Sequence, residues 1–362
     1  MLSWAITRAG YEMHEFLEKV PNVKEWMEGK RKPTVNQLEH FSKKVYLPFG
    51  YLFLSEPPKE DFPIPFFRTG RPQDKHIDIN VYDTVLLLQQ RQEWLKNYLI
   101  DNEFEKLPFV GRFSTHHNEK EIVADIRKTL QLPENWATGF RTWQEALNYL
   151  ITQIEDKGII TVFNGVVENN SHRKISVDKC RGFVLVDEMA PFMFVNNADA
   201  KAAQMFTVVH ELAHIWTGHS AGFDFREMLP AADAVEKLCD KVAAEFLVPE
   251  SLFIRLWKEH HDIKVLSRYF KVSQIVVARR ALDTGMISKR DFFGFYHNYI
   301  NKEYKTKTSG GDFYATTRKR LSITFASHIN AAVKTGQLLY RDAYKLTGLK
   351  GSTFQTFFSR NF

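Results

Sequence analysis

The sequence predicts an α+β fold that is mostly helical and carries one small mixed sheet in its middle. The first observation behind this prediction is a helical spacing of apolar residues, which runs through most of the chain on both sides of residues 158–196. The second is a change of pattern inside that stretch, where short runs of β-branched and aromatic residues are bounded by Gly, Asn and Asp. These runs, which we expect to be strands of one sheet, are Gly158–Phe163, Gly182–Asp187 and Pro191–Asn196.

Composition places the chain among globular proteins and limits its surroundings. With 362 residues, of which 44% are hydrophobic and 25% charged, it can bury a sizeable core, which excludes disordered and fibrous classes. Its 2 cysteines, Cys180 and Cys239, exclude a disulfide framework and favour a reducing, cytoplasmic location. No apolar run is long enough to cross a bilayer, and the charges within Met1–Val20 argue against a signal peptide, so we expect no membrane partner.

The pattern along the chain predicts five parts. Residues 1–55 are typical of short helices, and Pro33-Thr34 marks the entry of the last one. Five prolines within residues 56–75 indicate a linker or an extended arm. Amphipathic helices are then expected over Val81–Asn102, Glu119–Leu130 and Thr142–Lys157. The parts are an N-terminal helical domain (1–55), a Pro-rich linker (56–75), a helical domain (76–150), a central core with the sheet (151–262) and a basic helical C-terminal region (263–362).

The strongest chemical signal is the segment His210–His214 (HELAH) in a largely apolar helix expected over Ala200–Gly218, with Asp199 as its N-cap. Positions i and i+4 of a helix share one face, so both imidazoles can reach one ion, and zinc accepts imidazole nitrogens readily. Glu211 lies beside that face, where its carboxylate can hold and deprotonate a water molecule. Chance alone gives such a motif about 0.03 times in a chain with this His and Glu content.

A site with two histidines needs a third protein ligand. Glu236 and Asp240 lie one turn apart in a helical run that ends before Pro249. This spacing suits a ligand carboxylate at Glu236 and a second carboxylate, Asp240, that hydrogen-bonds the far nitrogen of a ligand histidine and fixes its tautomer. Three residues of the connecting segment compete with Glu236 as ligand, namely Asp224, Glu227 and Asp233.

Two further residues have suitable chemistry but rank lower. His219 follows His214 by five positions, off the ligand face, so a surface position is expected and substrate contact is the alternative. Cys239 offers a soft metal ligand, but an unpaired cysteine is more often a small buried hydrophobe.

Taken together, these motifs resemble the ImmA/IrrE family of zinc metallopeptidases, and in particular its longer prophage-type members with an Xre-like helix-turn-helix at the N-terminus. The central part of the resemblance is an ordered set of motifs, namely Arg181–Phe183 with Asp187, Pro191 and Asn196, then Phe206–His214, Glu236 and Val242–Pro249. Further motifs extend it over most of the chain, namely Pro33–Leu38, Phe53–Pro58, Phe67–Thr69 and Gly310–Tyr314.

The resemblance implies that His210, His214 and Glu236 bind Zn²⁺ and that Glu211 is the general base. It implies a minimal gluzincin fold, in which a small sheet packs on the HExxH helix and its edge strand pairs with an extended substrate. Members of the family are implied to cleave repressor-type regulators of mobile-element or stress genes, and some relatives pair with toxin genes. We therefore expect a regulatory protein as substrate, either repressor-like or a partner in a toxin–antitoxin pair.

The N-terminal region departs from a full helix-turn-helix. Only Pro21–Lys32 separates the preceding amphipathic helix from the Pro33-Thr34 helix, so a recognition helix can run only over about Asn22–Glu28. Glu25 and Glu28 would then face any phosphates. A protein-docking role is therefore as well supported for residues 1–55 as DNA binding.

Positive charge gathers instead at the C-terminus. Residues 301–362 hold 11 Lys or Arg and 3 Asp or Glu, a net charge of +8, so the rest of the chain sums to −2 within the total of +6. A second helix–turn–helix pattern lies here, with helices expected over Arg341–Leu346 and Ser352–Phe358, Gly348 in the turn and Ser352 as cap. This basic region is the expected site of any DNA contact, and a helical hairpin that completes the core is the competing interpretation.

The sequence thus favours a cytoplasmic zinc-dependent endopeptidase with a regulatory role. Zinc would polarise the scissile carbonyl while Glu211 activates water. The alternative from another class is a transcription regulator or antitoxin that binds DNA or a partner protein through a peptidase-like domain without turnover. A helical scaffold with an accidental motif is a third hypothesis, which the absence of bound metal would favour.

Overall fold

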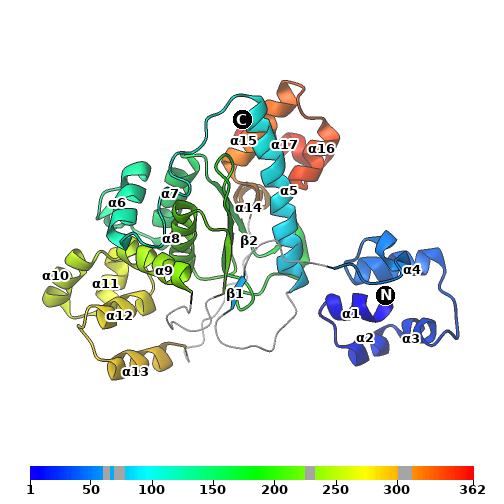
Figure 1. Ribbon diagram of the computed structural model, residues 1–362, viewed down its shortest axis with the longest axis horizontal. Helices are drawn as coiled ribbons and strands as arrows, with labels where there is room; N and C mark the ends of the chain where they lie inside the picture. The colour runs from blue at the N-terminus through cyan, green and yellow to red at the C-terminus, as the bar shows by residue number, and fades with distance from the viewer. Residues whose placement is uncertain (60–65, 69–77, 225–232, 301–311) are drawn as a thin grey trace. The chain divides into compact units, whose positions relative to one another are not determined.

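The computed structural model describes residues 1–59, 66–68, 78–224, 233–300 and 312–362 (Figure 1). It confirms the expected class, because the chain is mostly helical and has a small mixed sheet. The chain divides into two compact units. The first comprises Met1–Pro63 and Arg71–Leu86, and the second comprises Ile64–Gly70 and Leu87–Phe362.

The first unit is a small helical domain around an aromatic core. Phe16 and Phe41 meet edge to face with ring centroids 6.0 Å apart, and Ile6 and Val23 are fully buried beside them. Thr34 caps the last helix in a capping box with Gln37, as the Pro-Thr entry indicates. The unit's helices are α1 (Leu2–Arg8), α2 (Met13–Lys19), α3 (Pro21–Met27), α4 (Val35–Lys44) and a 3-10 turn at Phe49–Phe53. Helix α3 is as short as the sequence predicts.

The second unit is built on a five-stranded sheet with the order β1-β7-β5-β6-β2. The three predicted strands form its middle and one edge, while β1 and β7 extend it on the other side. Strand β5 is antiparallel to both neighbours, and the outer pairs β1·β7 and β2·β6 are parallel. The strands are β1 (Phe66–Arg68), β2 (Ile160–Asn164), β5 (Gly182–Leu185), β6 (Phe192–Asn196) and β7 (Ala221–Asp224), beside a separate hairpin of β3 (Val166–Val167) and β4 (Asn170–Lys174).

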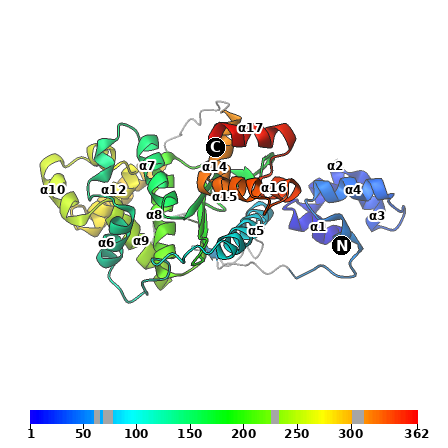
Figure 2. The same ribbon diagram turned by 90° about the horizontal axis from the view of Figure 1, so that it is seen from above.

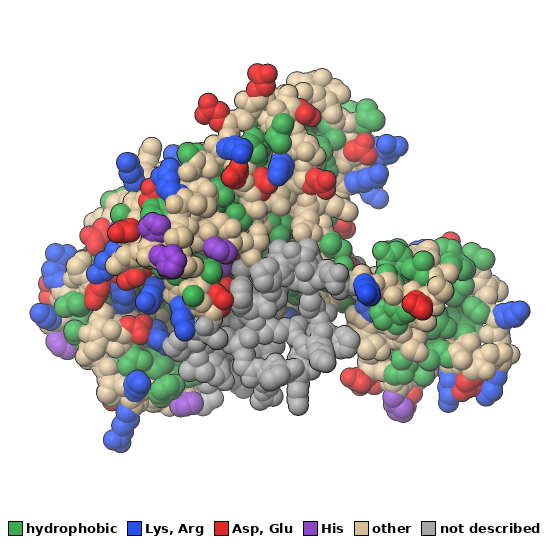
Figure 3. Space-filling model, in the orientation of Figure 1, with side chains coloured by type: hydrophobic (Ala, Val, Ile, Leu, Met, Phe, Trp, Pro, Cys, Tyr) green, Lys and Arg blue, Asp and Glu red, His purple; other side chains and the backbone are tan. Residues whose placement is uncertain are grey.

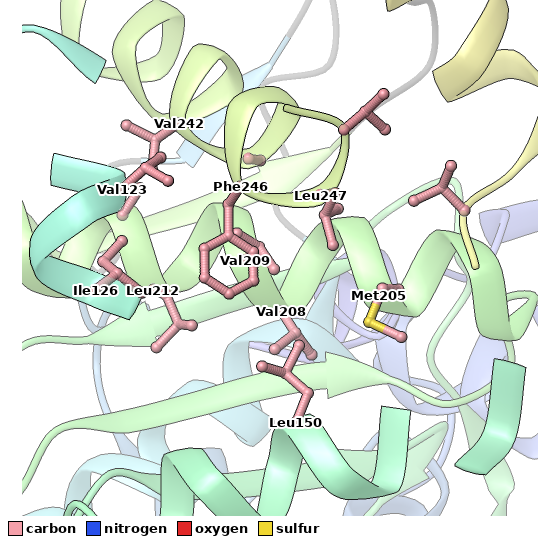
Figure 4. Close-up of a cluster of buried hydrophobic side chains, with 14 of the residues drawn as sticks. Val123, Ile126, Leu150, Met205, Val208, Val209, Leu212, Val242, Phe246 and Leu247 are labelled. Atoms are coloured by element: carbon pink, nitrogen blue, oxygen red, sulfur yellow. The ribbon is translucent and has the colours of Figure 1, made fainter. Parts of the chain in front are cut away.

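Helices cover one face of the sheet and form the main core with it (Figures 1 and 2). Figure 4 shows Phe246 from α9 lying over Val209 of α8, with Ile126 of α6 and Leu150 of α7 close by, and all four are fully buried. These helices are α6 (Glu119–Leu130), α7 (Trp143–Glu155), α8 (Lys201–Thr217) and α9 (Ala234–Leu247). The same core continues into α10 (Glu250–His260), α11 (Ile263–Phe270) and α12 (Gln274–Asp283), which α13 (Lys289–Ile300) follows.

The opposite face is covered by the second half of α5 and the C-terminal helices (Figure 2). Gln92 of α5 donates two hydrogen bonds of 2.8 Å to the carbonyls of Leu185 and Ala190 at the end of the sheet. Phe325 packs edge to face on Phe192 of β6, with ring centroids 5.6 Å apart. These helices are α5 (Ile79–Asp101), α14 (Phe313–Leu321), α15 (Ile323–Lys334), α16 (Tyr340–Thr347) and α17 (Gly351–Asn361).

Two local expectations, both of helix caps, are corrected by the structure. The N-cap of α8 is Ala200, because the carboxylate of Asp199 accepts a hydrogen bond of 2.8 Å from Arg181. Helix α17 begins one residue earlier than expected, so Ser352 lies inside the helix and does not cap it. The Pro-rich stretch, expected to be a linker or an extended arm, contains strand β1, whose partner lies far along the sequence. Gly348 does take the left-handed conformation expected of the turn, with φ of 68°.

Candidate metal centre

Helix α8 carries the HELAH segment through the centre of the core. Its C-terminal end is fixed by Trp216, which stacks on Phe109 with ring centroids 4.5 Å apart. The indole N–H of Trp216 also donates a hydrogen bond of 2.8 Å to Asp125. The helix ends at Gly218, where φ is +76° and a Cβ atom would lie 3.1 Å from the Cα atom of Gly111, so glycine suits this position doubly. The side chains at 210, 211 and 214 are therefore held on a rigid, buried helix, and each is 0% exposed.

Helix α9 brings a carboxylate to the same place. Asp233 caps this helix, because its side chain accepts hydrogen bonds from the backbone N–H groups of Val235 at 2.8 Å and Glu236 at 3.4 Å. Glu236 consequently lies in the first turn and points into the core, where it is 3% exposed. Asp233 thus serves as a cap. Asp224 and Glu227 are the other two residues that compete with Glu236 as the third ligand. The side chain of Asp224 lies outside the described part of the structure, and Glu227 lies outside it altogether.

Three side chains from α8 and α9 converge on one point. The Nε2 atoms of His210 and His214 are 3.1 Å apart. Oε2 of Glu236 lies 3.2 Å from the first of these nitrogens, and its Oε1 lies 3.1 Å from the second. A tetrahedral zinc ion with metal–ligand bonds of 2.0–2.1 Å separates its ligand atoms by about 3.3 Å. The three residues, which form the one potential metal-ligating group among the described residues, therefore fit a zinc ion in spacing and in donor chemistry.

Asp240 lies behind this group, one turn after Glu236. Its Oδ1 is 3.0 Å from Nδ1 of His210, and its side chain is 26% exposed. A carboxylate at this distance keeps the proton of a neutral imidazole on Nδ1 and leaves the Nε2 lone pair directed at the metal position. The structure thus places Asp240 where the sequence analysis expects a tautomer-fixing carboxylate.

Glu211 lies beside the three converging residues and is not one of them. Both of its carboxyl oxygens are buried, and neither has a hydrogen-bond partner among the described residues. Burial raises the pKa of Glu211 well above its usual value, the nearby Glu236 raises it further, and His210 acts in the opposite sense. An unpaired buried carboxyl group is costly, so its retention beside a metal position points to a water molecule or a reacting group as its partner.

Strand β5 shapes the wall next to Glu211. A Cβ atom at Gly182 would lie 3.0 Å from Oε1 of Glu211, 3.0 Å from the carbonyl oxygen of Phe194 and 2.5 Å from Cγ2 of Thr207. Only glycine fits there without displacing a neighbour. Composition and spacing gave no sign of this contact, because it depends on how α8 crosses the sheet.

The charges of the centre are strongly coupled in the metal-free protein. Burial alone would lower the pKa of His210, but Asp240 and Glu236 outweigh it and raise that pKa to about 10. Burial likewise opposes ionisation of Glu236, yet the two histidines lower its pKa to about 2. Burial lowers the pKa of His214, and contact with Glu236 offsets this only in part. A positive charge is thus strongly favoured at this point, as a bound cation requires.

The two lower-ranked residues stay outside the centre. His219 is exposed just beyond the end of α8, although it is near enough to His214 to lower the pKa of that residue slightly. Cys239 is a free, buried cysteine on α9, and burial raises the pKa of its thiol well above the usual value. A thiol that resists ionisation is a poor metal ligand, so a packing role is the better description of Cys239.

The centre lies inside a recognisable family domain. Residues 155–282 match the IrrE N-terminal-like domain, a peptidase family. This stretch holds strands β2 to β7 and helices α8 to α12, and so includes all five site residues, His210, Glu211, His214, Glu236 and Asp240. Residues 321–360, which cover α15 to α17, match a domain of unknown function. No curated protein and no solved structure gives a significant match to the chain.

The match covers the middle of the chain, and it supports a peptidase-type domain there. The Xre-like N-terminal domain and the prophage-type subgroup remain predictions, as does DNA binding. Among the described residues, no helix combines the length and the apolar character needed to cross a membrane.

Proposed function

We propose that the chain is a zinc-dependent endopeptidase with a regulatory role, whose substrate is a repressor-like protein or a partner in a toxin–antitoxin pair. One observation carries the proposal: His210, His214 and Glu236 converge with spacings of 3.1–3.2 Å beside the buried carboxyl group of Glu211, to which no described residue donates a hydrogen bond. The family match over residues 155–282 supports the same class of reaction.

Each residue of the centre has a distinct part in this reaction. His210, His214 and Glu236 would hold the zinc ion, and Asp240 orients the ring of His210 through its Nδ1 atom. When bound, zinc acts as a Lewis acid toward the scissile carbonyl and the attacking water. Glu211 takes the proton of that water and later gives it to the leaving nitrogen. Its raised pKa suits a group that must hold a proton between these two steps.

Cleavage of a partner protein tests the proposal. The chain is co-expressed with the products of neighbouring genes, and the mixture is analysed by mass spectrometry for fragments. We expect one partner to be cut by the wild type and to stay intact with Glu211→Gln, which keeps the shape of the side chain but cannot take a proton. General-base loss of this kind costs about two to four orders of magnitude in rate. Equal cleavage by both proteins would remove Glu211 from the mechanism.

A regulator that binds without turnover is the second candidate, and the burial of the centre favours it. With His210, Glu211 and His214 all 0% exposed, the chain in this conformation does not present the centre to a protein substrate. The two candidates differ in the role of Glu211. A binding-only regulator leaves its partner uncut, and it retains partner or DNA binding in the Glu211→Gln variant.

A further inference from the structure

The strand next to Glu211 already has a neighbour from the same chain. Strand β5 touches Glu211 at Gly182, and on the side away from β6 it pairs antiparallel with β7, in the register Gly182↔Phe223, Phe183↔Gly222 and Val184↔Ala221. β7 pairs in turn with β1 in the parallel register Phe66↔Gly222, Phe67↔Phe223 and Arg68↔Asp224. In the order β1-β7-β5-β6, strand β5 is therefore already paired on both sides, and no free edge of β5 is left beside the centre.

From this arrangement we infer that β1 and β7 form a strap along the sheet beside the metal centre, and that β1 must detach before a protein substrate can add a strand to β7. The inference rests on the proposed function and specifies how that function is regulated. An extended substrate binds a peptidase of this kind by adding a strand to the sheet beside the active site, because backbone hydrogen bonds supply sequence-independent affinity. Here β7 already pairs with β5, so the edge to which a substrate would add is that of β7, and β1 occupies this edge.

The burial of the centre agrees with a covered state. His210, Glu211 and His214 are 0% exposed and Glu236 is 3% exposed. Among the five site residues, only Asp240, which contacts the centre from behind, has appreciable exposure, at 26% of its side chain. A scissile carbonyl needs direct contact with the metal position and with Glu211, and this conformation leaves no exposed surface of either group.

The strap is short, which makes detachment inexpensive. β1 pairs with β7 over three residues, and it follows Pro65, which has no N–H group to lengthen the ladder. β7 is four residues long and begins four residues after α8 ends. Short edge strands with few buried backbone bonds open at a small fraction of the global unfolding free energy. At the other edge of the sheet β2 packs against α14, so the strap side is the edge that can open.

A partner that presents an extended segment is the natural releasing agent. Such a segment can take the place of β1 on β7, because it offers the same backbone hydrogen bonds. To do so it must bind β7 more strongly than does β1, which is a strand of three residues held nearby by the chain. The regulatory protein substrate of the proposed function can supply such an extended segment if its cleavage site lies in an unfolded, strand-forming stretch.

Proline substitutions in β1 test the strap in the full-length, zinc-loaded protein. Successive residues of a strand direct their N–H groups to opposite sides, so either Phe67→Pro or the double variant Phe66→Pro/Arg68→Pro removes a hydrogen bond to β7. Lys59→Pro adds a proline to the same segment outside the strand and is the matched control. The first readout is the rate at which a colorimetric chelator removes Zn²⁺, and the second is amide hydrogen exchange at residues 221–224.

We expect at least one of the two β1 variants to release zinc about tenfold faster than the wild type and to lose protection at residues 221–224, while Lys59→Pro changes neither. If all proteins release zinc at the same rate, β1 does not limit access to the centre. The chelator does not require peptidase activity, so this result is independent of the proposed function. Cleavage of an unfolded casein is measured in parallel. Faster zinc release without any cleavage would support the strap and contradict the proposed peptidase activity.

A reversible lock gives the opposite perturbation. Phe67 and Phe223 are register partners, so Phe67→Cys/Phe223→Cys places two thiols across the β1·β7 pair. The native cysteines are buried and do not compete. The oxidised protein should release zinc and cut casein more slowly than the reduced form of the same preparation. Full activity of the oxidised protein would show that substrate enters without detachment of β1, and would overturn the inference while leaving the peptidase intact.

Discussion

The Nε2 atom of His210 lies 3.1 Å from the Nε2 atom of His214. Two imidazole nitrogens that face each other at this distance repel unless a proton or a cation lies between them or on one of them. In the metal-free protein that positive charge is a proton, which the two carboxylates of Glu236 and Asp240 stabilise on His210. A metal ion at the same point must displace this proton, so the protonation state and metal binding are linked.

Zinc binding at pH 7 should therefore release at least one proton per chain. His210, with a pKa of about 10, carries a proton that zinc must expel, whereas the lowered pKa of His214 leaves that residue neutral already. Zinc affinity should accordingly rise about tenfold per pH unit as the pH increases toward 10. Titration calorimetry in buffers of different ionisation enthalpy counts the released protons.

Asp240→Asn serves as the comparison for this count. Without the charge of Asp240 the pKa of His210 falls, so fewer protons are bound at pH 7 and fewer are released. Release of no proton by the wild type would contradict the assignment of the proton to His210.

Glu211→Gln should stabilise the metal-free protein at neutral pH. Burial raises the pKa of Glu211 in the folded state above its usual 4.5, so the unfolded chain ionises first as the pH rises, and ionisation favours unfolding above about pH 4.5. Glutamine removes that cost, with a gain on the order of 1–3 kcal/mol. Thermal unfolding of metal-free protein from pH 4 to pH 8 checks this. The gain should vanish at the acidic end, and Glu105→Gln, at an exposed position, should show no such trend.

Gly182→Ala should impair the centre without touching a ligand. The new methyl group meets Cγ2 of Thr207 at 2.5 Å and Oε1 of Glu211 at 3.0 Å, so the helix or the carboxylate must move. Overpacking of this kind costs about 1–3 kcal/mol in the free energy of unfolding. Denaturant unfolding and partner cleavage should both decline relative to Gly139→Ala, where a Cβ atom meets nothing within 4 Å. A fully active, fully stable Gly182→Ala protein would mean that β5 does not pack against Glu211 in this way.

DNA binding through the basic C-terminal region stays a prediction, which the structure sharpens. Arg320 is occupied by a hydrogen bond of 3.0 Å to Asn169, whereas Arg318, Lys345 and Lys350 are exposed. Acidic and basic side chains are interspersed over the C-terminal helices on the face in Figure 3, so any contact must be local. Neutralising the three exposed residues should lower the slope of log affinity against log salt by about one unit each, measured by titration with duplex DNA.

Removal of residues 1–55 provides the comparison for this titration. The truncation should leave the salt slope nearly unchanged, because those residues carry a net charge of only +2. Loss of binding on truncation would place the DNA contact in residues 1–55. An absence of salt-dependent binding in the whole chain would contradict any DNA contact of this kind.

The sequence predicted the parts of the centre that depend on local pattern. The span of α8 and the face shared by His210 and His214 follow from helical periodicity, and the three expected strands became β2, β5 and β6. Glu236 and Asp240 were found because they lie one turn apart on a single helix.

The parts that the sequence did not reveal depend on pairing between distant segments. Strand β1 lies in a Pro-rich stretch that has the composition of a linker, and its strand character comes from pairing with β7, about 155 residues later in the chain. The contact of Gly182 with Glu211 likewise depends on how α8 lies on the sheet. Asp199 has the chemistry of an N-cap, but Arg181 engages its carboxylate first. No local pattern encodes which of two possible partners a side chain takes.

The most direct test of the central claim is elemental analysis of the zinc bound to purified wild type, His214→Ala and Glu211→Gln. We expect about one zinc ion per chain in the wild type and in Glu211→Gln, because Glu211 lies beside the ligands and is not one of them, and almost none in His214→Ala. Equal zinc in all three proteins, or none in the wild type, would contradict a zinc centre formed by His210, His214 and Glu236.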